Sequence, residues 1–505
     1  MTSPTSSNHK PAGIPVPSST SSFWHSEPSE FLLGHRTTSE LPKTVDYCII
    51  GSGITGSSCA RFLAEDERTK GKSILMLEAR EACWGATGRN GGHCQVLPVA
   101  RSMDVTQFEV DNYETVKSYI AEHNVECEWR SLDGCRAYYS SDMFKVAETE
   151  VSELKKHSGE LGKLVNAVTD KEELAKLRVS KAVGATLCSA AASLWPYKLV
   201  SFVLEKLVKE GKLNLQTNTP VEMISDLGIG PAVRIHTSRD VIFANHVILA
   251  TNGYTSHLLP EFADLIVPVR GEMSSLLPPK GSERLEASYG LCGQPGQPSH
   301  GDDYLNQRPF EGVPNPAGHF MFGGGDGEAK HERIGVWDDS IVDEGMAAWL
   351  RRKLLEAMDI GGETEGLKEL EATHQWSGIM GYSRDNLPWV GCVPHRGNYV
   401  WLAGGYTGHG MPNGTLCGKA VAKMVLATEA AGLAYTPEVE DHAVKESGLP
   451  RGYLISEDRM NKARKLPTVA AAEAMGAIGN HARQEGKTVW KGMLDYVTSF
   501  VWGRS

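Results

Sequence analysis

The chain has 505 residues, of which 41% are hydrophobic and 22% charged, and its formal net charge is −11. This length exceeds one ordinary core and predicts two domains with extensions at both ends. The acidic balance, with no basic stripe, argues against nucleic acid as a partner because nothing would offset phosphate repulsion. The most apolar segment, Leu416–Tyr435, is interrupted by Lys419, Lys423 and Glu429, so no transmembrane segment is predicted.

The cysteine usage and the two termini indicate an intracellular protein. The ten cysteines form no C-x-x-C pair, which is typical of reduced, buried thiols, and no metal site is expected. Residues 1–22 are rich in Ser, Thr and Pro, lack the apolar centre of a signal peptide and are expected to be mobile. Trp502–Ser505 does not match the peroxisomal signal. The cytoplasm is therefore the expected location.

The ordered pattern begins after an N-terminal extension, residues 1–44. Val45–Ile50 predicts a strand buried on both faces, Ser57–Ala64 a helix, and Ser73–Glu78 a second buried strand. These three elements have the size and order of one βαβ unit.

Helical and strand-like segments alternate along the rest of the chain. Helical spacing predicts helices over 104–123, 141–179, 200–209 and 340–358, and apolar runs predict strands over 213–217, 233–237, 247–250 and 399–405. Residues 266–335 are rich in Gly, Pro and alternating apolar residues, which favours a β-rich region.

A last core helix is expected from about Pro412, followed by a C-terminal extension, residues 433–505. This extension carries few strong signals, and it has apolar residues near its end: Trp490, Tyr496, Phe500 and Trp502. Docking on the body of the protein is the favoured interpretation, and a partner or a membrane surface are the alternatives.

The first strand-to-helix turn carries the spacing G-x-G-x-x-G, which in this context has a physical meaning. Gly51 permits the sharp turn, Gly53 lets the backbone approach a pyrophosphate, and Gly56 allows the helix to pack closely on the strand. Glu78, which ends the second strand, is placed to bind ribose hydroxyls. The pattern predicts a dinucleotide site without separating FAD from NAD.

The stretch Trp84–His93 favours FAD over NAD. Its small and polar residues offer many backbone N–H groups with little steric cover, so it can follow a pyrophosphate and pass along the edge of an isoalloxazine ring. A nicotinamide enzyme has no evident need for such a segment. Arg89 is the exception to smallness, and two roles stay open for it: pairing with phosphate or locking the loop.

At this point the sequence resembles the D-amino-acid-oxidase and glycine-oxidase family of flavoproteins, nearest the branch of γ-glutamylputrescine oxidase and its fungal relatives. The motifs run in the family's order: Asp46–Ala60, Glu78–Arg80, Gly85–His93, Pro268–Gly271, Phe320–Gly325, Trp376–Asp385 and Gly404–Gly410. Jointly they are specific for fold and cofactor, and much less so for substrate.

The resemblance implies an α/β fold with a Rossmann-like FAD-binding domain assembled from residues 45–100, 185–265 and 375–432. Residues 101–184 and 266–374 would form an α+β substrate domain whose sheet covers the flavin. Val221 would contact the adenine region through its backbone, and Thr251–Gly253 would close the adenosine pocket. The expected FAD contacts are Gly51, Gly53, Ile54, Thr55, Gly56, Glu78, Ala79, Arg80, Ala86, Thr87, Arg89, Asn90, Gly91, Gly92, Val221, Thr251, Asn252, Gly253, Asp385, Gly405, Tyr406, Thr407, Gly408, His409 and Gly410.

Two departures from covalent members of the family argue for non-covalent FAD. Gly85 stands where one subgroup links flavin to a histidine, and Gly378 where another has a linking cysteine. His93 lies close enough to keep the question open.

The segment Gly404–Gly410 joins a strand to the helix predicted from Pro412. The positive end of that helix can face the edge of the flavin where negative charge develops on reduction. Oxidation of a neutral amine by hydride transfer to flavin N5 needs proximity and desolvation more than a strong base, so no catalytic triad is required.

The candidate catalytic residues are His93, Tyr304 and His409, and the candidate substrate-binding residues are Arg270, Trp376 and Tyr382. Each has a structural alternative. The histidines can satisfy loop hydrogen bonds, Tyr304 and the other aromatic residues can pack in the core, and an ion pair of Arg270 can support the sheet.

The sequence therefore predicts an FAD-dependent amine or amino-acid oxidase that is reoxidised by dioxygen with release of hydrogen peroxide. A flavin dehydrogenase, or a specialised-metabolism oxidase acting on a larger C–N, C–O or C–C substrate, is the first alternative. A flavin-binding assembly or scaffold protein is the second.

Overall fold

The computed structural model describes residues 10–99, 101–226, 233–295, 297, 302–311 and 318–473. Its first sheet has the order β16-β17-β10-β1-β2-β7, with β8 and β9 continuing from β10. The strands are β1 Thr44–Ile50, β2 Ile74–Leu77, β7 Asn214–Gln216, β8 Val221–Asp226, β9 Val233–Thr237, β10 Val241–Leu249, β16 Trp389–Cys392 and β17 Val400–Gly404. The central pairs β17-β10, β10-β1, β1-β2 and β2-β7 are parallel, so their carboxyl ends meet at one edge.

Both faces of the first sheet are covered. Successive residues of β1 point to opposite faces, so each face can be followed through alternate residues of this strand. Tyr47 and Ile49 belong to the apolar cluster shared with the helices α1 (Ile54–Ala64), α2 (Met103–His123), α6 (Pro196–Lys209) and α9 (Gly414–Ala430). Cys48 and Ile50 belong to the cluster on the other face, with β8, β9, α7 (Thr255–Leu258) and α11 (Glu457–Arg464). The strand is thus buried on both faces, as the unbroken apolar run predicts.

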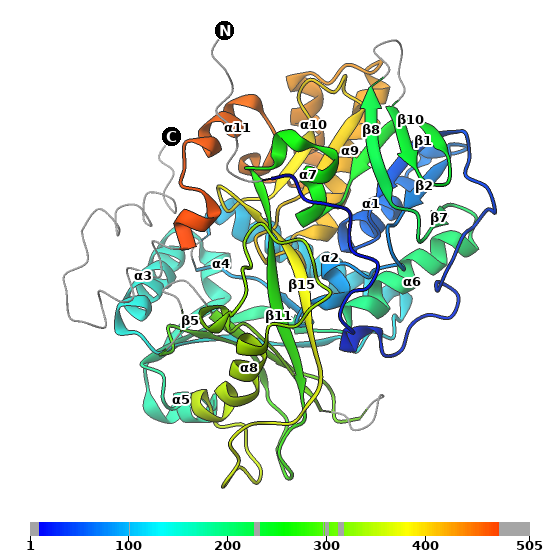
Figure 1. The fold of residues 1–505 in the computed structure, drawn as a ribbon. Coiled ribbons are helices and arrows are strands. Elements are labelled where there is room, and N and C mark those ends of the chain that lie inside the picture. The colour runs from blue at the N-terminus through cyan, green and yellow to red at the C-terminus, as the bar shows by residue number, and fades with distance from the viewer. Residues whose placement is uncertain are drawn as a thin grey trace.

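A second sheet has the order β15-β11-β14-β13-β12-β4-β6-β3, with β5 paired to β6. Figure 1 shows its two longest strands, β11 and β15, side by side across the middle of the molecule, with α8 (Glu344–Ala357) beside them. The strands are β3 His93–Gln95, β4 Arg130–Tyr138, β5 Val165–Val168, β6 Gly184–Ser193, β11 Ile266–Leu276, β12 Ala287–Cys292, β13 Asp302–Gln307, β14 Phe320–Gly323 and β15 Ala372–Ser383. The β-rich region predicted over residues 266–335 is therefore present.

One predicted helical region is wrong in part. Residues 141–179 contain the helices α3 Ser141–His157, α4 Gly159–Lys163 and α5 Lys171–Lys176, but the strand β5 lies between the last two. β5 forms because residues 165–168 pair with residues 185–188 of β6, a contact that local helical spacing does not encode. β6 itself falls in a segment assigned to the FAD domain, yet it belongs to the second sheet; the domain boundaries stay a prediction.

Both extensions contact the body of the protein. Residues 10–22 were expected to be mobile, but Ala12 is only 3% exposed and Ser22 only 1%, because backbone and hydroxyl groups of this segment bond to distant strands and loops. At the other end, α10 (Pro437–Ser447) packs on α9, and buried Leu454 and Ile455, between α10 and α11, contact β16 of the first sheet, in line with the favoured interpretation. The four apolar residues from Trp490 onward lie outside the described residues.

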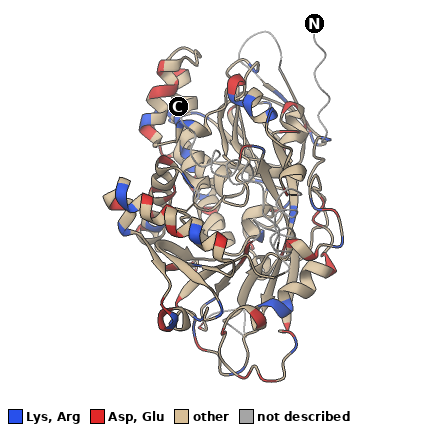
Figure 2. Ribbon diagram, turned by 90° about the vertical axis from the view of Figure 1, so that its left-hand side faces the viewer, with Lys and Arg blue, Asp and Glu red and all other residues tan. Residues whose placement is uncertain are grey.

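The remaining short helices are η1 Phe23–His25, η2 Glu67–Thr69, η3 Ala86–Arg89, η4 Asn252–Tyr254, η5 Pro260–Phe262, η6 Asp326–Glu328 and η7 Arg451–Tyr453. Lys and Arg alternate with Asp and Glu along the outer helices in the view of Figure 2. Within the described part of the chain, no helix combines the length and hydropathy that crossing a bilayer requires.

Candidate active site

One cavity of about 390 Å³ extends from the carboxyl edge of the first sheet to the face of the second. Its lining includes the first glycine turn, the end of β2, the loop after β2, η4, the corner before α9 and residues of β3, β4, β11, β13 and β15. Its volume and its mixed polar and apolar lining are typical of a cofactor or substrate site.

The glycine turn is closed by contacts that leave no room for side chains. Gly51 has a φ of +104°, and a Cβ there would lie 2.7 Å from the Ala250 carbonyl oxygen. A Cβ on Gly56 would lie 1.9 Å from the Gly51 oxygen. Gly56 therefore differs from the expectation of a cofactor contact: it lies beneath the turn, where it lets α1 approach β1, and it does not line the cavity.

Glu78 lies at the end of β2, facing the glycine turn. Its Oε2 accepts hydrogen bonds from the Ser52 amide (3.0 Å) and the Ser52 hydroxyl (2.6 Å), and its Oε1 accepts one from the Arg80 amide (3.0 Å). The carboxylate is thus held at the cavity wall, where a ribose hydroxyl donor can reach it.

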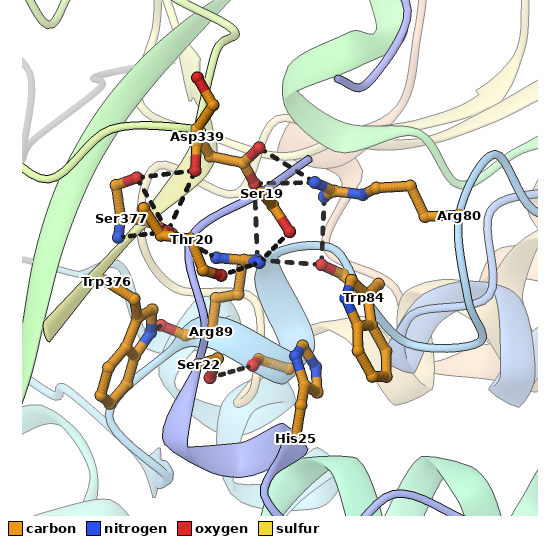
Figure 3. A network of polar contacts seen from close by, with 12 residues as sticks. Ser19, Thr20, Ser22, His25, Arg80, Trp84, Arg89, Asp339, Trp376 and Ser377 are labelled. Carbon is orange, nitrogen blue, oxygen red and sulfur yellow. Dashed lines mark hydrogen bonds and ion pairs between the residues drawn. The ribbon is translucent and has the colours of Figure 1, made fainter. Parts of the chain in front are cut away.

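Arg89 makes the contacts expected of one of its two open roles, locking the loop. Its guanidinium donates to the carbonyl oxygens of Trp84 (3.0 Å) and Ser377 (2.8 Å), and it lies 3.4 Å from the Asp339 carboxylate. Asp339 also binds Arg80 at 3.0 Å, so one buried carboxylate lies between two guanidinium groups (Figure 3). Arg89 therefore locks the loop 84–93 to β15, and its pairing with a phosphate stays a prediction.

The corner before α9 is shaped by backbone hydrogen bonds from other strands. The Gly405 amide donates to Asn252 Oδ1 (3.0 Å), and the Thr407 amide donates to the Gly381 carbonyl (2.8 Å). Gly408 has a φ of +83°, a conformation that glycine adopts without strain. The helix begins at Gly414, with Asn413 as its cap, so Pro412 lies before the first turn and not inside it.

The far end of the cavity carries polar side chains of the second sheet. His93 of β3 and Tyr304 of β13 meet edge to face with ring centroids 5.6 Å apart. Arg136 of β4 forms an ion pair with Asp302 at 2.8 Å, and Tyr382 of β15 also lines this part.

Burial makes these groups resist ionisation. It lowers the pKa of His93 to about 4, although a hydrogen bond to the Leu305 carbonyl opposes this shift. Burial also holds the pKa of His409 well below its usual value, and it raises the pKa values of Tyr304 and Tyr382. At neutral pH this end of the cavity therefore presents uncharged imidazole and phenol groups.

Several expected site residues lie outside the lining. Arg270 binds the Glu332 carbonyl (3.3 Å), Trp376 donates to the Arg89 carbonyl (2.8 Å), and Asp385 pairs with Arg459 at 2.9 Å. Each of the three is therefore taken up by structural contacts. Gly92 and Gly405 also lie outside the lining, and each supplies a positive φ at a turn.

The other expected residues reach the cavity: Gly51, Gly53, Ile54, Thr55, Glu78, Ala79, Arg80, Ala86, Thr87, Arg89, Asn90, Gly91, His93, Val221, Thr251, Asn252, Gly253, Tyr304, Tyr382, Tyr406, Thr407, Gly408, His409 and Gly410. Their contacts with ligands stay predictions. Sequence reasoning missed Arg136, Glu272 and Asp302, which also line the cavity. Two of them had a signal in the sequence, because Asp302 lies two residues before Tyr304 and Glu272 directly follows the motif Pro268–Gly271. Arg136 lies on a strand for which no motif was found.

The glycine turn, the acidic end of β2 and the loop that follows fit a dinucleotide, because a Cβ on Gly53 would lie 2.9 Å from Thr87 Oγ1 and close the approach to the backbone. A second sheet places neutral polar groups at the other end of the same cavity. Fold and site thus define a dinucleotide-dependent oxidoreductase with its reaction site between two sheets.

Comparison with known proteins gives the particular family. Residues 46–424 match the DAO family of FAD dependent oxidoreductases, and the chain belongs to that family. It is an FAD-dependent enzyme, as the motifs predicted. The chain is 23% identical over 399 residues to gamma-glutamylputrescine oxidoreductase of Escherichia coli (strain K12), which covers 76% of this chain and 84% of that protein.

Solved structures confirm the fold. Glycine oxidase from Geobacillus kaustophilus aligns with a TM-score of 0.61 at 16% identity, over 78% of this chain and 99% of that one. L-proline dehydrogenase from P. horikoshii aligns with a TM-score of 0.59 at 20% identity, over 81% and 100%. The resemblance inferred from the motifs is therefore confirmed for family, fold and cofactor.

Proposed function

We propose that the protein oxidises the C–N bond of a small amine or amino acid, with non-covalent FAD as the immediate electron acceptor. The observation that carries the proposal is His93, an uncharged imidazole that lines the cavity and whose Nε2 has no hydrogen-bond partner among the described residues. FAD, when bound, supplies the group that accepts a hydride from the substrate.

The hydrogen bonding of His93 fixes its tautomer. The ring bonds to the Leu305 carbonyl, which accepts, so the nitrogen that makes this bond carries the proton. Nε2 has no hydrogen-bond partner among the described residues and is therefore a lone-pair acceptor. We assign His93 Nε2 as the atom that accepts a hydrogen bond from the substrate nitrogen and so orients the uncharged amine, the form that can release a hydride.

The neighbouring groups suit a small polar substrate. Tyr304 and Tyr382 offer hydroxyl groups and aromatic faces, and ring faces attract an ammonium group. The Arg136–Asp302 pair offers a cation and an anion at the same end of the cavity, which would suit a zwitterion. His409, at the corner before α9, would face the cofactor.

The names of the relatives support this substrate class. A gamma-glutamylputrescine oxidoreductase and a glycine oxidase both act on compounds that contain a C–N bond. A protein of the same fold is a proline dehydrogenase, so the fold does not by itself select the final electron acceptor. We propose that dioxygen reoxidises the flavin and that hydrogen peroxide is released. A cytoplasmic location stays a prediction.

The test is anaerobic mixing of the purified yellow protein with a panel of amines and amino acids, followed by admission of oxygen. We expect one class of amine to bleach the flavin and oxygen to restore its colour with an equal amount of peroxide. Bleaching without oxygen consumption would change the proposal to a dehydrogenase. Bound FAD that no amine or amino acid reduces would contradict it.

A further inference from the structure

The N-terminal segment lies across the cofactor cavity. The family match begins at residue 46, so residues 10–22 are outside the part of the chain shared with the family. Ile14 and Pro15 nevertheless line the cavity. In Figure 1 the segment is the dark blue coil that passes α7 and descends in front of the first sheet to η1.

One end of the segment is attached to α7. The Ala12 amide donates to Ser256 Oγ (2.9 Å), and Ala12 is 3% exposed. Gly13 touches the Trp337 ring so closely that a Cβ would lie 2.5 Å from its Nε1. Because α7 directly follows Thr251–Gly253, this attachment lies at the edge of the cavity formed by the end of β10.

The other end is attached to β15 and to the loop after β2 (Figure 3). The Thr20 hydroxyl accepts hydrogen bonds from the Ser377 amide (3.0 Å) and the Arg89 guanidinium (3.1 Å), and the Thr20 amide donates to the Asp339 carbonyl (2.8 Å). Ser22 Oγ donates to the Gly88 carbonyl (2.8 Å). This attachment uses the same Asp339 that binds Arg80 and Arg89.

The two attachments lie on opposite sides of the dinucleotide end of the cavity. Ser256 is close to the end of β10, while Asp339 reaches Arg80, two residues after Glu78. Ile14 and Pro15 therefore bridge the carboxyl edge of the first sheet, away from the end that His93 and Tyr304 form. Residues 11–22 carry no charged side chain that would repel a diphosphate, and three prolines among them limit the conformations lost on docking.

We propose that residues 12–22 form a strap that retains FAD: Ile14 and Pro15 cover its adenosine diphosphate half, and the cofactor leaves only after the strap detaches. Release then requires the loss of the hydrogen bonds of Ala12, Thr20 and Ser22 before the nucleotide can move. In this arrangement the glycine turn and the end of β2 hold the cofactor on the side of the first sheet, and the strap covers it on the opposite side.

The first test places a carboxylate on the covering face. In Ile14→Asp the new charge is added at the cavity lining, where it would repel the diphosphate of bound FAD, whereas in Ser18→Asp the same charge is added at an exposed position of the same segment. The measurement is FAD fluorescence recovered after dilution of the full-length holoprotein. We expect release at least tenfold faster for Ile14→Asp and within twofold of the parent for Ser18→Asp. Equal release rates in all three proteins would overturn the proposal.

The second test loosens the strap at a residue that does not itself line the cavity. Thr20→Val keeps the shape of the side chain and removes the hydroxyl that binds Ser377 and Arg89, while Ser21→Ala removes an exposed hydroxyl next to it. We expect severalfold faster release from Thr20→Val alone. This variant decides the matter if Ile14→Asp does not fold.

Melting temperatures with and without added FAD separate retention from general stability. If the strap retains FAD, Thr20→Val lowers the increase in melting temperature that FAD gives more than it lowers the melting temperature of the apoprotein. An effect on the apoprotein alone, with unchanged release, would overturn the proposal. Flavin that stays attached to the denatured chain would also overturn it, because a covalent bond would then retain the cofactor.

Discussion

The end of the cavity at the glycine turn, the proposed nucleotide end, and the end at His93 and Tyr304, the proposed substrate end, are built in different ways. The nucleotide end takes backbone groups and small residues from short local segments, such as Gly51–Thr55 and Glu78–Arg80. The substrate end takes side chains from β3, β4, β13 and β15. A site made of local backbone is encoded by spacing, whereas a site made of distant side chains depends on sheet pairing. Substitutions at the two ends should therefore affect different properties.

The largest effect is expected at the nucleotide end, from Gly56→Ala. A Cβ there would lie 1.9 Å from the Gly51 oxygen, so α1 must move away from β1. We expect a loss of about 3 kcal/mol in the free energy of unfolding, together with loss of bound FAD. Gly159→Ala is the matched control, since no atom lies within 4 Å of its Cβ, its φ is not positive and it does not line the cavity. Urea unfolding and flavin absorbance check both; equal effects would contradict the packing argument.

At the substrate end, His93→Gln should change rate and leave cofactor binding intact. Loss of this hydrogen-bond acceptor is expected to misplace the substrate amine and to slow flavin reduction about 100-fold, as stopped-flow absorbance would measure. His319→Gln is the control: burial also lowers the pKa of His319 to about 4, but His319 does not line the cavity. If both variants reduce at the parent rate, His93 has only a structural role.

Glu272 gives the substrate end a pH dependence of stability. Burial raises the pKa of this carboxyl to about 8, although the charges of Arg270 and Arg333 oppose the effect and that of Asp343 adds to it. The folded state keeps the proton that the unfolded state loses near its ordinary pKa of 4.5, so stability falls as pH rises between these values.

Glu272→Gln removes this titration. Between pH 5 and pH 7 we expect the free energy of unfolding of the parent to fall by about 2 kcal/mol relative to that of the variant. The expected slope is about 1.4 kcal/mol per pH unit. Urea titrations at both pH values measure it. A difference that does not change with pH would show that Glu272 is ionised in the folded protein.

The smallest effect is expected in the corner before α9, where Gly408 can be compared with Gly410. Gly408 has a φ of +83°, whereas Gly410 has no positive φ and only ordinary contacts around its Cβ. We expect Gly408→Ala to cost about 1 kcal/mol and to weaken FAD binding severalfold, and Gly410→Ala to change little. Titration of apoprotein with FAD measures both. Equal losses would indicate that space, and not backbone conformation, limits this corner.

The strand-to-helix turns show how much local pattern reveals. The unit from Val45 to Glu78, the corner at Gly404–Gly410 and the loop 84–93 were all predicted, because burial on both faces and glycine spacing leave direct traces in the sequence. Asp385 and Arg270 look the same by motif as residues that line the cavity. Their side chains are occupied by Arg459 and by the Glu332 carbonyl, which no local pattern reports.

By itself the sequence determined the family, the FAD cofactor and the glycine turn, because these depend on backbone conformation over a few adjacent residues. Tertiary structure decided that β5 is a strand, that Arg89 forms an ion pair with Asp339, and that Ile14 and Pro15 line the cavity. Each of these outcomes rests on a contact between residues far apart in the chain, whose free energy exceeds the local preference of the segments concerned.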